Sequence, residues 1–599
     1  MKLSDYIFSQ LQEWGARHVF LITGGGAMHL NDSVGTSGLS YVCTHHEQAA
    51  AMAAEGYARI AGKPGIVNVT TGPGAINSLN GVFGAWTDSI PMLIISGQVK
   101  RETCMASYGL TELRQLGDQE VDIIRMVRGI TKYSVFVNDP ESIVYHLGRA
   151  WHLAQTGRPG PCWLDIPVDV QSAQIDPAQL KRYDPAEDLP AFDSANASRQ
   201  VADVLARISK AQRPVILAGS GVRIADALSE FEQVIRALRI PVVTAWTHDL
   251  IASDDELFCG RPGTIGERAG NFTVQNSDVL LVLGSRLNIR QTSYNWGSFA
   301  RFATKIQVDV DPAELKKPLH QPDVPICCDL KLFLAHMAKQ LADRDNSHSG
   351  HEKWLSHARQ WRNKYPVVQS RQRVEGPPLN PYDFIDRLFE MLGPDDALVC
   401  GNATACIVTY QVAKLKKGER LISNSGSASM GYDLPAAIGV AIAKGSRTIC
   451  IAGEGSLQMN IQELQTVVGY KLPIKLFVLN NGGYLSIRQT QTGFFQGRKI
   501  GEGPETGVTF PQMKRIGEAY GIASFTVDKV ADLDLVRREL QSPGASLFDV
   551  VLDSSQEFEP RLRSRILPDG KILTPNLEDM YPFLTPEELA SNMVVEDRK

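Results

Sequence analysis

The sequence has no long apolar run, no block of basic residues and no signal-peptide pattern at its start. Its longest apolar stretches fall short of the ~20 residues that a membrane-spanning helix needs. Its net charge is −5 and its Lys and Arg residues are not clustered, so binding to nucleic acid is not expected. The polar beginning of the chain lacks the apolar core of a secretion signal. We therefore expect neither a nucleic-acid partner nor a membrane partner.

The nine cysteines form no spaced framework and no Cys-x-x-Cys motif, and the only adjacent pair is Cys327-Cys328. Reduced thiols in a cytoplasmic protein are the simplest explanation. The chain is 599 residues long, 43% hydrophobic and 21% charged, which is typical of a globular protein with several domains.

A pattern of short apolar strand, Gly-rich turn and helix recurs along the chain and predicts α/β domains with parallel sheets. Segments rich in Pro, Asp or other polar residues separate these domains at 176–193 and 343–352. The Pro-rich, charged end of the chain is expected to wrap a surface or cover a site entrance. We predict domains at 1–175, 195–342 and 376–556 and an irregular tail at 557–599.

One βαβ unit, spanning residues 449–484, carries oxygen ligands at the ends of both of its strands. Its first strand ends at Glu454, between two glycines, and its second ends at Asn480-Asn481, 27 residues after that glutamate. A right-handed crossover brings neighbouring strand ends together. Turn glycines at a helix N-terminus favour an anion, and Mg²⁺ takes a few protein oxygens together with phosphates. The unit therefore predicts a metal–diphosphate site.

This spacing resembles the thiamine-diphosphate motif, and other segments resemble further motifs of the same enzyme superfamily in the correct order. These segments are residues 44–54, 71–77, 88–91, 130–133 and 426–439. The sequence is most similar to the acetolactate synthase (acetohydroxyacid synthase) group. Residues 24–32 and 481–489 look like a bacterial branch associated with surface-polysaccharide sugars.

The resemblance implies three doubly wound α/β domains, which are pyrimidine-binding, central and diphosphate-binding. It also implies that Glu47 hydrogen-bonds N1′ of the aminopyrimidine and activates the cofactor. A helix-cap or surface glutamate is the alternative, which the companion motifs disfavour. Further implied cofactor contacts are Pro73, Asn77, Asn402, Ala403, Ala428, Met430, Gly453, Gly455, Ser456, Asn481 and Tyr484. For Asn402-Ala403, an ordinary strand-end turn is an alternative.

The implied metal ligands are Glu454, the Asn481 side chain and the Gly483 carbonyl, for Mg²⁺ or another divalent cation. The family usually has Asp where this chain has Glu454, and glutamate is one methylene longer. Direct ligation after a small backbone shift, ligation through water, a different cation and a weakened site all stay open, because Mg²⁺ tolerates little departure from octahedral geometry.

Two further positions are implied to be catalytic. Gly25 stands where simple decarboxylases carry an acid or a hydroxyl, which leaves space for a second reactant. Gln119 matches the glutamine of the Phe-Gln-Glu motif of acetohydroxyacid synthases, although Asp118 replaces the Phe. It either orients the intermediate or begins a solvated helix.

The acceptor side departs from acetohydroxyacid synthases, which carry Met and Trp in place of Ser486 and Thr490. The smaller residues predict a wider and more polar acceptor pocket. Arg488 either faces this pocket, where it would bind a carboxylate or phosphate, or forms a surface pair. FAD stays open, because Gly219-Ser220-Gly221 and residues 284–287 are only loosely compatible with a flavin site.

The predicted activity is decarboxylation of a 2-oxo acid, most simply pyruvate, with transfer of the two-carbon unit to a carbonyl acceptor, as in acetolactate synthase. One alternative is transfer to a nucleotide-linked keto-sugar, and another is an inactive, cofactor-binding regulatory subunit. The resemblance also implies a homodimer or homotetramer in which two chains form each site.

Overall fold

The computed structural model describes residues 1–188, 192–245, 249–343, 350–566 and 571–595. The chain divides into two compact units: Met1–Pro190, Ala397–Cys406 and Ile422–Leu552 form one, and Ala191–Asp396, Ile407–Leu421 and Asp553–Lys599 form the other. Parts of both predicted linkers and of the tail lie outside the described residues. Over the described ranges, no helix combines the length and the apolarity needed to cross a membrane.

The N-terminal part of the first unit is built on a six-stranded parallel sheet of order β2-β1-β3-β4-β6-β5. Its strands are β1 His18–Leu21, β2 Ser40–Cys43, β3 Gly65–Val69, β4 Met92–Gln98, β5 Tyr133–Phe136 and β6 Pro161–Pro167. Every residue of β3, β4 and β6 is buried, which is typical of a parallel sheet covered on both faces.

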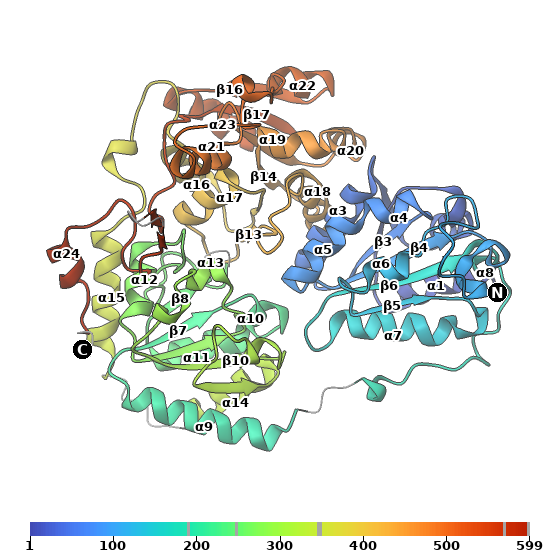
Figure 1. Ribbon diagram of the computed structural model, residues 1–599, viewed down its shortest axis with the longest axis horizontal. Coiled ribbons are helices and arrows are strands. Elements are labelled where there is room, and N and C mark those ends of the chain that lie inside the picture. The colour runs from blue at the N-terminus through green and yellow to red at the C-terminus, as the bar shows by residue number, and fades with distance from the viewer. Residues whose placement is uncertain (189–191, 246–248, 344–349, 567–570, 596–599) are drawn as a thin grey trace. The chain divides into compact units, whose positions relative to one another are not determined.

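Helices cover both faces of this sheet (Figure 1). Helices α1 Leu3–Glu13, α2 Met28–Thr36 and α7 Ile143–Gln155 share one core with one face. Helices α3 Glu47–Ala61 and α5 Leu79–Asp88 share the other core, which also includes residues of the C-terminal part of the same unit. The short helices are α4 Pro73–Asn77, α6 Ile123–Val127 and α8 Val168–Gln171.

The C-terminal part of the first unit repeats this strand order. Its sheet has the order β13-β12-β14-β15-β17-β16. If β12 is numbered as its first strand, this is the same order as β2-β1-β3-β4-β6-β5 in the N-terminal sheet. The strands are β12 Ala397–Cys400, β13 Arg420–Ile422, β14 Thr448–Gly453, β15 Ile474–Asn480, β16 Ala523–Val527 and β17 Ser546–Val551. The helices are α17 Thr404–Val412, α18 Asp433–Lys444, α19 Glu454–Leu457, α20 Glu463–Gly469, α21 Leu485–Phe494, α22 Met513–Ala519 and α23 Leu533–Leu540. Residues Ile407–Leu421, which include most of α17 and of β13, are counted with the second unit.

Two glycines let the alanine-rich helix α3 approach α18 at backbone distance. A Cβ added at Gly439 would lie 1.8 Å from the Ala53 carbonyl oxygen, and one added at Gly56 would lie 2.4 Å from that of Ala436. The two halves of this unit are therefore packed directly on each other through α3 and α18.

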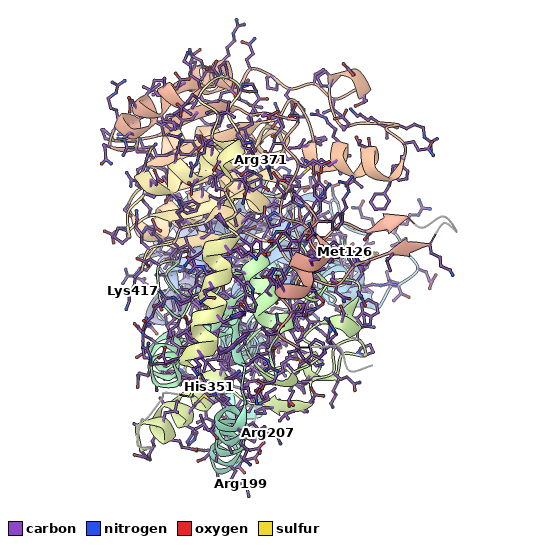
Figure 2. The ribbon with its side chains drawn as sticks, turned by 90° about the vertical axis from the view of Figure 1, so that its left-hand side faces the viewer. Met126, Arg199, Arg207, His351, Arg371 and Lys417 are labelled. Carbon is purple, nitrogen blue, oxygen red and sulfur yellow. The ribbon has the colours of Figure 1, made fainter. Side chains whose placement is uncertain are left out.

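The second unit contains a five-stranded parallel sheet of order β11-β10-β9-β7-β8. Its strands are β7 Pro214–Ala218, β8 Val242–Thr244, β9 Val279–Leu283, β10 Thr304–Asp309 and β11 Val324–Cys327. Its helices are α9 Ser194–Lys210, α10 Gly221–Ile224, α11 Leu228–Leu238, α12 Arg268–Gln275, α13 Ile289–Thr292, α14 Leu330–Ala342, α15 Glu352–Lys364 and α16 Pro381–Met391. Helix α9 presents a charged, exposed face that includes Arg199 and Arg207 (Figure 2). The prediction of three parallel-sheet α/β domains is confirmed.

The irregular tail wraps over the surface of the second unit. It contains a small hairpin, β18 Arg565–Ile566 with β19 Ile572–Leu573, and one short helix, α24 Pro586–Ser591. Side chains of α12 and α15 hold it: Asn271 donates to the Leu577 carbonyl at 2.9 Å, and Trp361 donates to the Asn592 side chain at 3.0 Å. Polar groups of the tail therefore find hydrogen-bond partners on these helices.

Candidate active site

The predicted metal ligands meet at the carboxyl ends of two neighbouring strands. Strands β14 and β15 pair in parallel, with Gly453 opposite Leu479, so the residues that follow them lie side by side. Glu454 Oε1 accepts hydrogen bonds from the N–H groups of Asn481, at 3.1 Å, and Gly483, at 2.8 Å. The longer glutamate side chain thus reaches across to the neighbouring turn.

Two oxygens of this turn region fit a divalent cation. Among the residues that the structure describes, no donor reaches the buried Oδ1 of Asn481, and its amide nitrogen lies 3.4 Å from Thr404 Oγ1. Glu454 is only 2% exposed, and burial raises the pKa of its carboxyl to about 7. A divalent cation would satisfy both the amide oxygen and the carboxylate.

Neutral oxygens would have to complete such a site. No cluster of three or more His, Cys, Asp or Glu side chains suited to a metal occurs in the described part of the chain. The Gly483 carbonyl accepts from the Leu485 N–H at 3.0 Å, which leaves it one lone pair. The donor set is therefore of the kind that Mg²⁺ accepts when phosphate oxygens and water supply the rest.

The predicted diphosphate turn is shaped by close contacts. A Cβ added at Gly455 would lie 2.1 Å from the Tyr484 ring, so only glycine fits beneath this ring, whereas one added at Gly453 would meet no atom within 4 Å. The Ser456 hydroxyl donates to Asp433 at 2.5 Å and accepts from the Gly431 N–H at 2.8 Å. This hydroxyl is engaged inside the protein, which leaves backbone N–H groups as the donors available to an anion.

The predicted aminopyrimidine segment is joined to the end of β12. Asn402 Nδ2 donates to the Ala428 carbonyl at 3.0 Å, so the structure brings these two predicted residues together. Ala403 and Ala428 both have positive φ, 49° and 53°, and Met430 is half-buried. The carbonyl predicted to face the cofactor is thus held by a side chain from the neighbouring strand end.

The N-terminal residues of the predicted site form a second group. Glu47 is the first residue of α3, and its Oε2 accepts from Asn77 Nδ2 at 3.0 Å. Pro73 begins the helix α4 that carries Asn77, and a Cβ added at Gly74 would lie 3.3 Å from Glu47 Oε1. Asn77 therefore orients the carboxylate, while Glu47 itself stays half-buried in the single chain.

Gly25 borders open space, whereas its neighbours do not. A Cβ added at Gly25 would meet no atom within 4 Å, but one added at Gly24 or Gly26 would lie 2.5 Å from Thr70 or 2.8 Å from Thr71. The turn is thus closed against the sheet on both sides of Gly25 and open at Gly25 itself.

Gln119 lies against the Gly72-Pro73 turn. Its backbone has φ +65°, and its carbonyl oxygen would lie 2.2 Å from a Cβ added at Gly72. Gly72 itself has φ +61°, so glycine is needed there for both conformation and space.

No hydrogen bond or ion pair joins these two groups within the described part of the chain. Other contacts do connect the halves of this unit: Ser429 donates to Asn80 at 2.8 Å, and Tyr432 donates to Glu55 at 2.7 Å. The structure therefore brings the predicted residues together as one group around Glu47 and another around Glu454.

Several residues around these groups were not predicted from the sequence. The buried Glu120 carboxylate accepts from the N–H groups of Met105, Leu116 and Gly117, so it pins the irregular segment before Gln119. Its place next to Gln119 is the one sequence signal that could have indicated it. Asp433, which holds Ser456, carried no separate signal because it lies inside an apolar helix start.

Asp165 was also missed, and it lies beneath the Thr71 turn. Its carboxylate accepts from Ser96 at 2.6 Å and from Gln98 at 3.1 Å, and Gln98 in turn accepts from Thr71 at 2.7 Å. Burial is the main cause that raises the pKa of Asp165 to about 7, and the carboxylates of Glu120 and Asp122 add to it.

We expect Asp165 to make the protein less stable as pH rises. Its folded-state pKa of about 7 exceeds the ordinary aspartate value of 3.8, so the folded state binds more protons between these values. The unfolding free energy should therefore fall by up to about 4 kcal/mol across that window, and D165N should remove this fall. Thermal unfolding at several pH values checks it, with the exposed D184N as control; equal pH slopes in wild type and D165N would contradict it.

Comparison with known proteins supports one family over most of the chain. Family models of the thiamine pyrophosphate enzymes match residues 1–126 (N-terminal TPP binding domain), 201–337 (central domain) and 401–550 (C-terminal TPP binding domain). The acetolactate synthase large subunit of Lactococcus lactis is 29% identical, covering 95% of this chain and 96% of the relative. The probable acetolactate synthase large subunit of Methanocaldococcus jannaschii is 30% identical, covering 93% of each.

A chloroplastic acetolactate synthase of Arabidopsis thaliana is also similar, at 31% identity over 94% of this chain and 83% of the relative. The expected superfamily is confirmed. The chain therefore belongs to the thiamine pyrophosphate enzymes, in the group that includes the acetolactate synthase large subunits.

Proposed function

We propose that the protein decarboxylates a 2-oxo acid, most simply pyruvate, and transfers the two-carbon unit to a carbonyl acceptor. The proposal is supported by its similarity to proteins named acetolactate synthase large subunits. The observation that carries this proposal is the pair of oxygen groups at the ends of β14 and β15: the buried Oδ1 of Asn481, which no donor in the described part of the chain reaches, and the buried Glu454 carboxylate beside it. They suit a divalent cation, Mg²⁺ or a similar ion, that holds a diphosphate.

Each group of residues has its own task in this proposal. Thiamine diphosphate, when bound, supplies the electron sink for decarboxylation. Glu47, oriented by Asn77, holds and moves a proton at a ring nitrogen. Backbone N–H groups of the turn at Gly453 and Gly455 bind the anion, and Met430 packs against the rings. Gln119 and the open side of Gly25 border the reacting carbon.

We propose that two chains form each site in a homodimer or homotetramer. Within the described part of the chain, no hydrogen bond or ion pair joins the Glu47 group to the Glu454 group, and apolar side chains are exposed beside both. Ile76 and Phe83 are exposed near the first group, and Ile487 and Phe494 near the second. A second copy of the chain would cover these side chains and remove water from Glu47.

The alternative acceptor, a nucleotide-linked keto-sugar of the surface-polysaccharide branch, is favoured by the open space at Gly25. The acceptor side of α21 is also lined by small residues: Thr490 is exposed, and its hydroxyl folds back onto the Ser486 carbonyl at 2.9 Å. A larger, polar acceptor would fit beside such a surface.

Release of CO₂ from pyruvate in the presence of thiamine diphosphate and Mg²⁺, with NMR of the products, tests the proposal. Acetolactate supports the main proposal. Release that accelerates only with an added keto-sugar supports the alternative acceptor. Cofactor binding without CO₂ from any 2-oxo acid would instead indicate an inactive regulatory subunit.

Enlarging Gly25 separates the acceptor question from the donor question. Gly25→Leu should reduce transfer to a large acceptor more than it reduces CO₂ release from pyruvate, because a Cβ at this position meets no atom within 4 Å and the longer side chain would extend into the space beside the reacting carbon. It should lower kcat/KM for a keto-sugar relative to pyruvate as acceptor by about 10- to 200-fold. Gly24→Leu and Gly26→Leu are the contrasting variants, since they collide with Thr70 and Thr71 and should unfold the turn. Equal acceptor ratios in wild type and Gly25→Leu would contradict this role.

Flavin is not part of the proposal. Gly219 and Gly221 pack directly on Gly284, with an added Cβ at Gly219 only 2.4 Å from the Gly284 carbonyl, so backbone contact accounts for these glycines. The visible absorbance of the purified protein tests this point. We also propose that the three domains span residues 1–175, 195–342 and 376–556 and that the tail spans 557–599.

A further inference from the structure

The turn that carries Asn481 continues through Gly482 and Gly483, and glycine restricts the backbone conformation less than other residues do. Gly482 and Gly483 have φ values of 62° and 145°, in the region that favours glycine. Glycine also loses more conformational freedom on folding than any other residue. The position of the Asn481 side chain therefore depends on what surrounds the turn.

Contacts from two sides hold this turn. From one side Glu454 accepts the N–H groups of Asn481 and Gly483. From the other side the Arg488 guanidinium donates to the Gly482 carbonyl at 2.9 Å, with a longer contact of 3.4 Å to the Asn481 carbonyl. Arg488 thus contacts the carbonyls of both peptide groups that flank Gly482.

Glu502 holds the arginine in place. Glu502 is only 4% exposed, and its carboxylate accepts a hydrogen bond from Arg488 Nε at 2.6 Å. Its backbone carbonyl accepts from the Tyr484 N–H at 2.7 Å. Its own backbone is fixed by Thr506, whose hydroxyl accepts from the Glu502 N–H at 2.9 Å.

Gly483 is the residue that makes this packing fit. A Cβ there would lie 2.2 Å from the Glu502 carbonyl oxygen and 2.6 Å from the Arg488 guanidinium. The segment around Glu502 therefore lies directly against the turn.

We propose that Arg488 and Glu502 are positioning residues that clamp the Asn481–Gly483 turn and so set Asn481 Oδ1 for a divalent cation. The inference rests on the cation site of the proposed function. Neither residue touches the cation; both act through the turn. The carboxylate of Glu502 offsets the charge of Arg488, so the guanidinium adds no net positive charge beside a cation. This is the arrangement expected of outer partners that orient metal ligands.

The test is Mn²⁺ binding, followed by electron paramagnetic resonance in the presence of thiamine diphosphate. Arg488→Met and Glu502→Gln should each weaken Mn²⁺ binding by about 10- to 100-fold. In the metal-free protein, amide hydrogen exchange at Gly482 and Gly483 should be faster in both variants. The exposed Arg498, on the same segment, gives the matched control Arg498→Met, which should bind Mn²⁺ like the wild type.

Glu454→Gln distinguishes failure of the clamp from failure of the cation site. If Glu454→Gln loses Mn²⁺ while both clamp variants bind it normally, the clamp is overturned and the cation site stands. If Glu454→Gln also binds normally, the cation site fails, and the clamp fails with it. Should Arg488→Met not fold, Arg488→Lys serves instead, because lysine keeps the charge but cannot donate to the carbonyl and the carboxylate in the same fork geometry.

Discussion

Glu47→Gln should lower kcat by about 100- to 10,000-fold, the range by which a positioned acid–base group accelerates a reaction. Glutamine keeps the shape and can still accept from Asn77, which donates to Glu47 at 3.0 Å in the structure. It cannot give or take the proton, so binding of the cofactor should persist while turnover is lost. CO₂ release from the 2-oxo acid, measured at saturating thiamine diphosphate and Mg²⁺, checks this expectation.

Glu13→Gln is the control for this change, because Glu13 ends α1 and is exposed. Asn77→Ala offers a graded comparison: the carboxylate remains but loses its orienting donor, so a smaller loss than in Glu47→Gln is expected. Unchanged turnover in Glu47→Gln would remove Glu47 from the mechanism.

The fold could be predicted from the sequence because the strands of its βαβ units are mostly apolar and end at turns. The strand before Glu454 and the strand before Asn480 were recognised in this way, and parallel pairing then brought their ends together. Less regular strands such as β16 Ala523–Val527, at the edge of its sheet, were not singled out, because partial exposure mixes polar residues into the apolar pattern.

Hydrogen-bond partners in the site could not be predicted in the same way. The Ser456 hydroxyl was expected to face the diphosphate, but it bonds Asp433, 23 residues earlier in the chain. Arg488 pairs with Glu502 across a glycine-rich segment that has no periodicity. Such pairings depend on how loops are packed, and no local pattern encodes them. Spacing in the sequence indicated which residues gather, whereas the choice among their partners came only from the structure.

Glu454→Gln should weaken Mn²⁺ binding by more than the roughly 100-fold upper range of outer-partner changes, because it removes the only carboxylate among the proposed ligands. The fold should survive: glutamine can still accept from the Gly483 N–H through its amide oxygen, at the place where Glu454 accepts at 2.8 Å. Glu454→Asp keeps the charge but withdraws it by one methylene from that N–H, so intermediate affinity is expected. Calorimetry with Mn²⁺ in the presence of thiamine diphosphate measures all three proteins.

Mixing two inactive variants then tests where the site is built. If each site joins the Glu47 group of one chain to the Glu454 group of another, a hybrid of Glu47→Gln and Glu454→Gln contains one site with both glutamates intact. Co-expression of the two should therefore restore turnover that neither variant shows alone. A site formed within a single chain cannot be rescued in this way, because each chain then carries one defect in its own site. Absence of rescue in purified hybrids would contradict the shared site and leave the two glutamates to act within one chain.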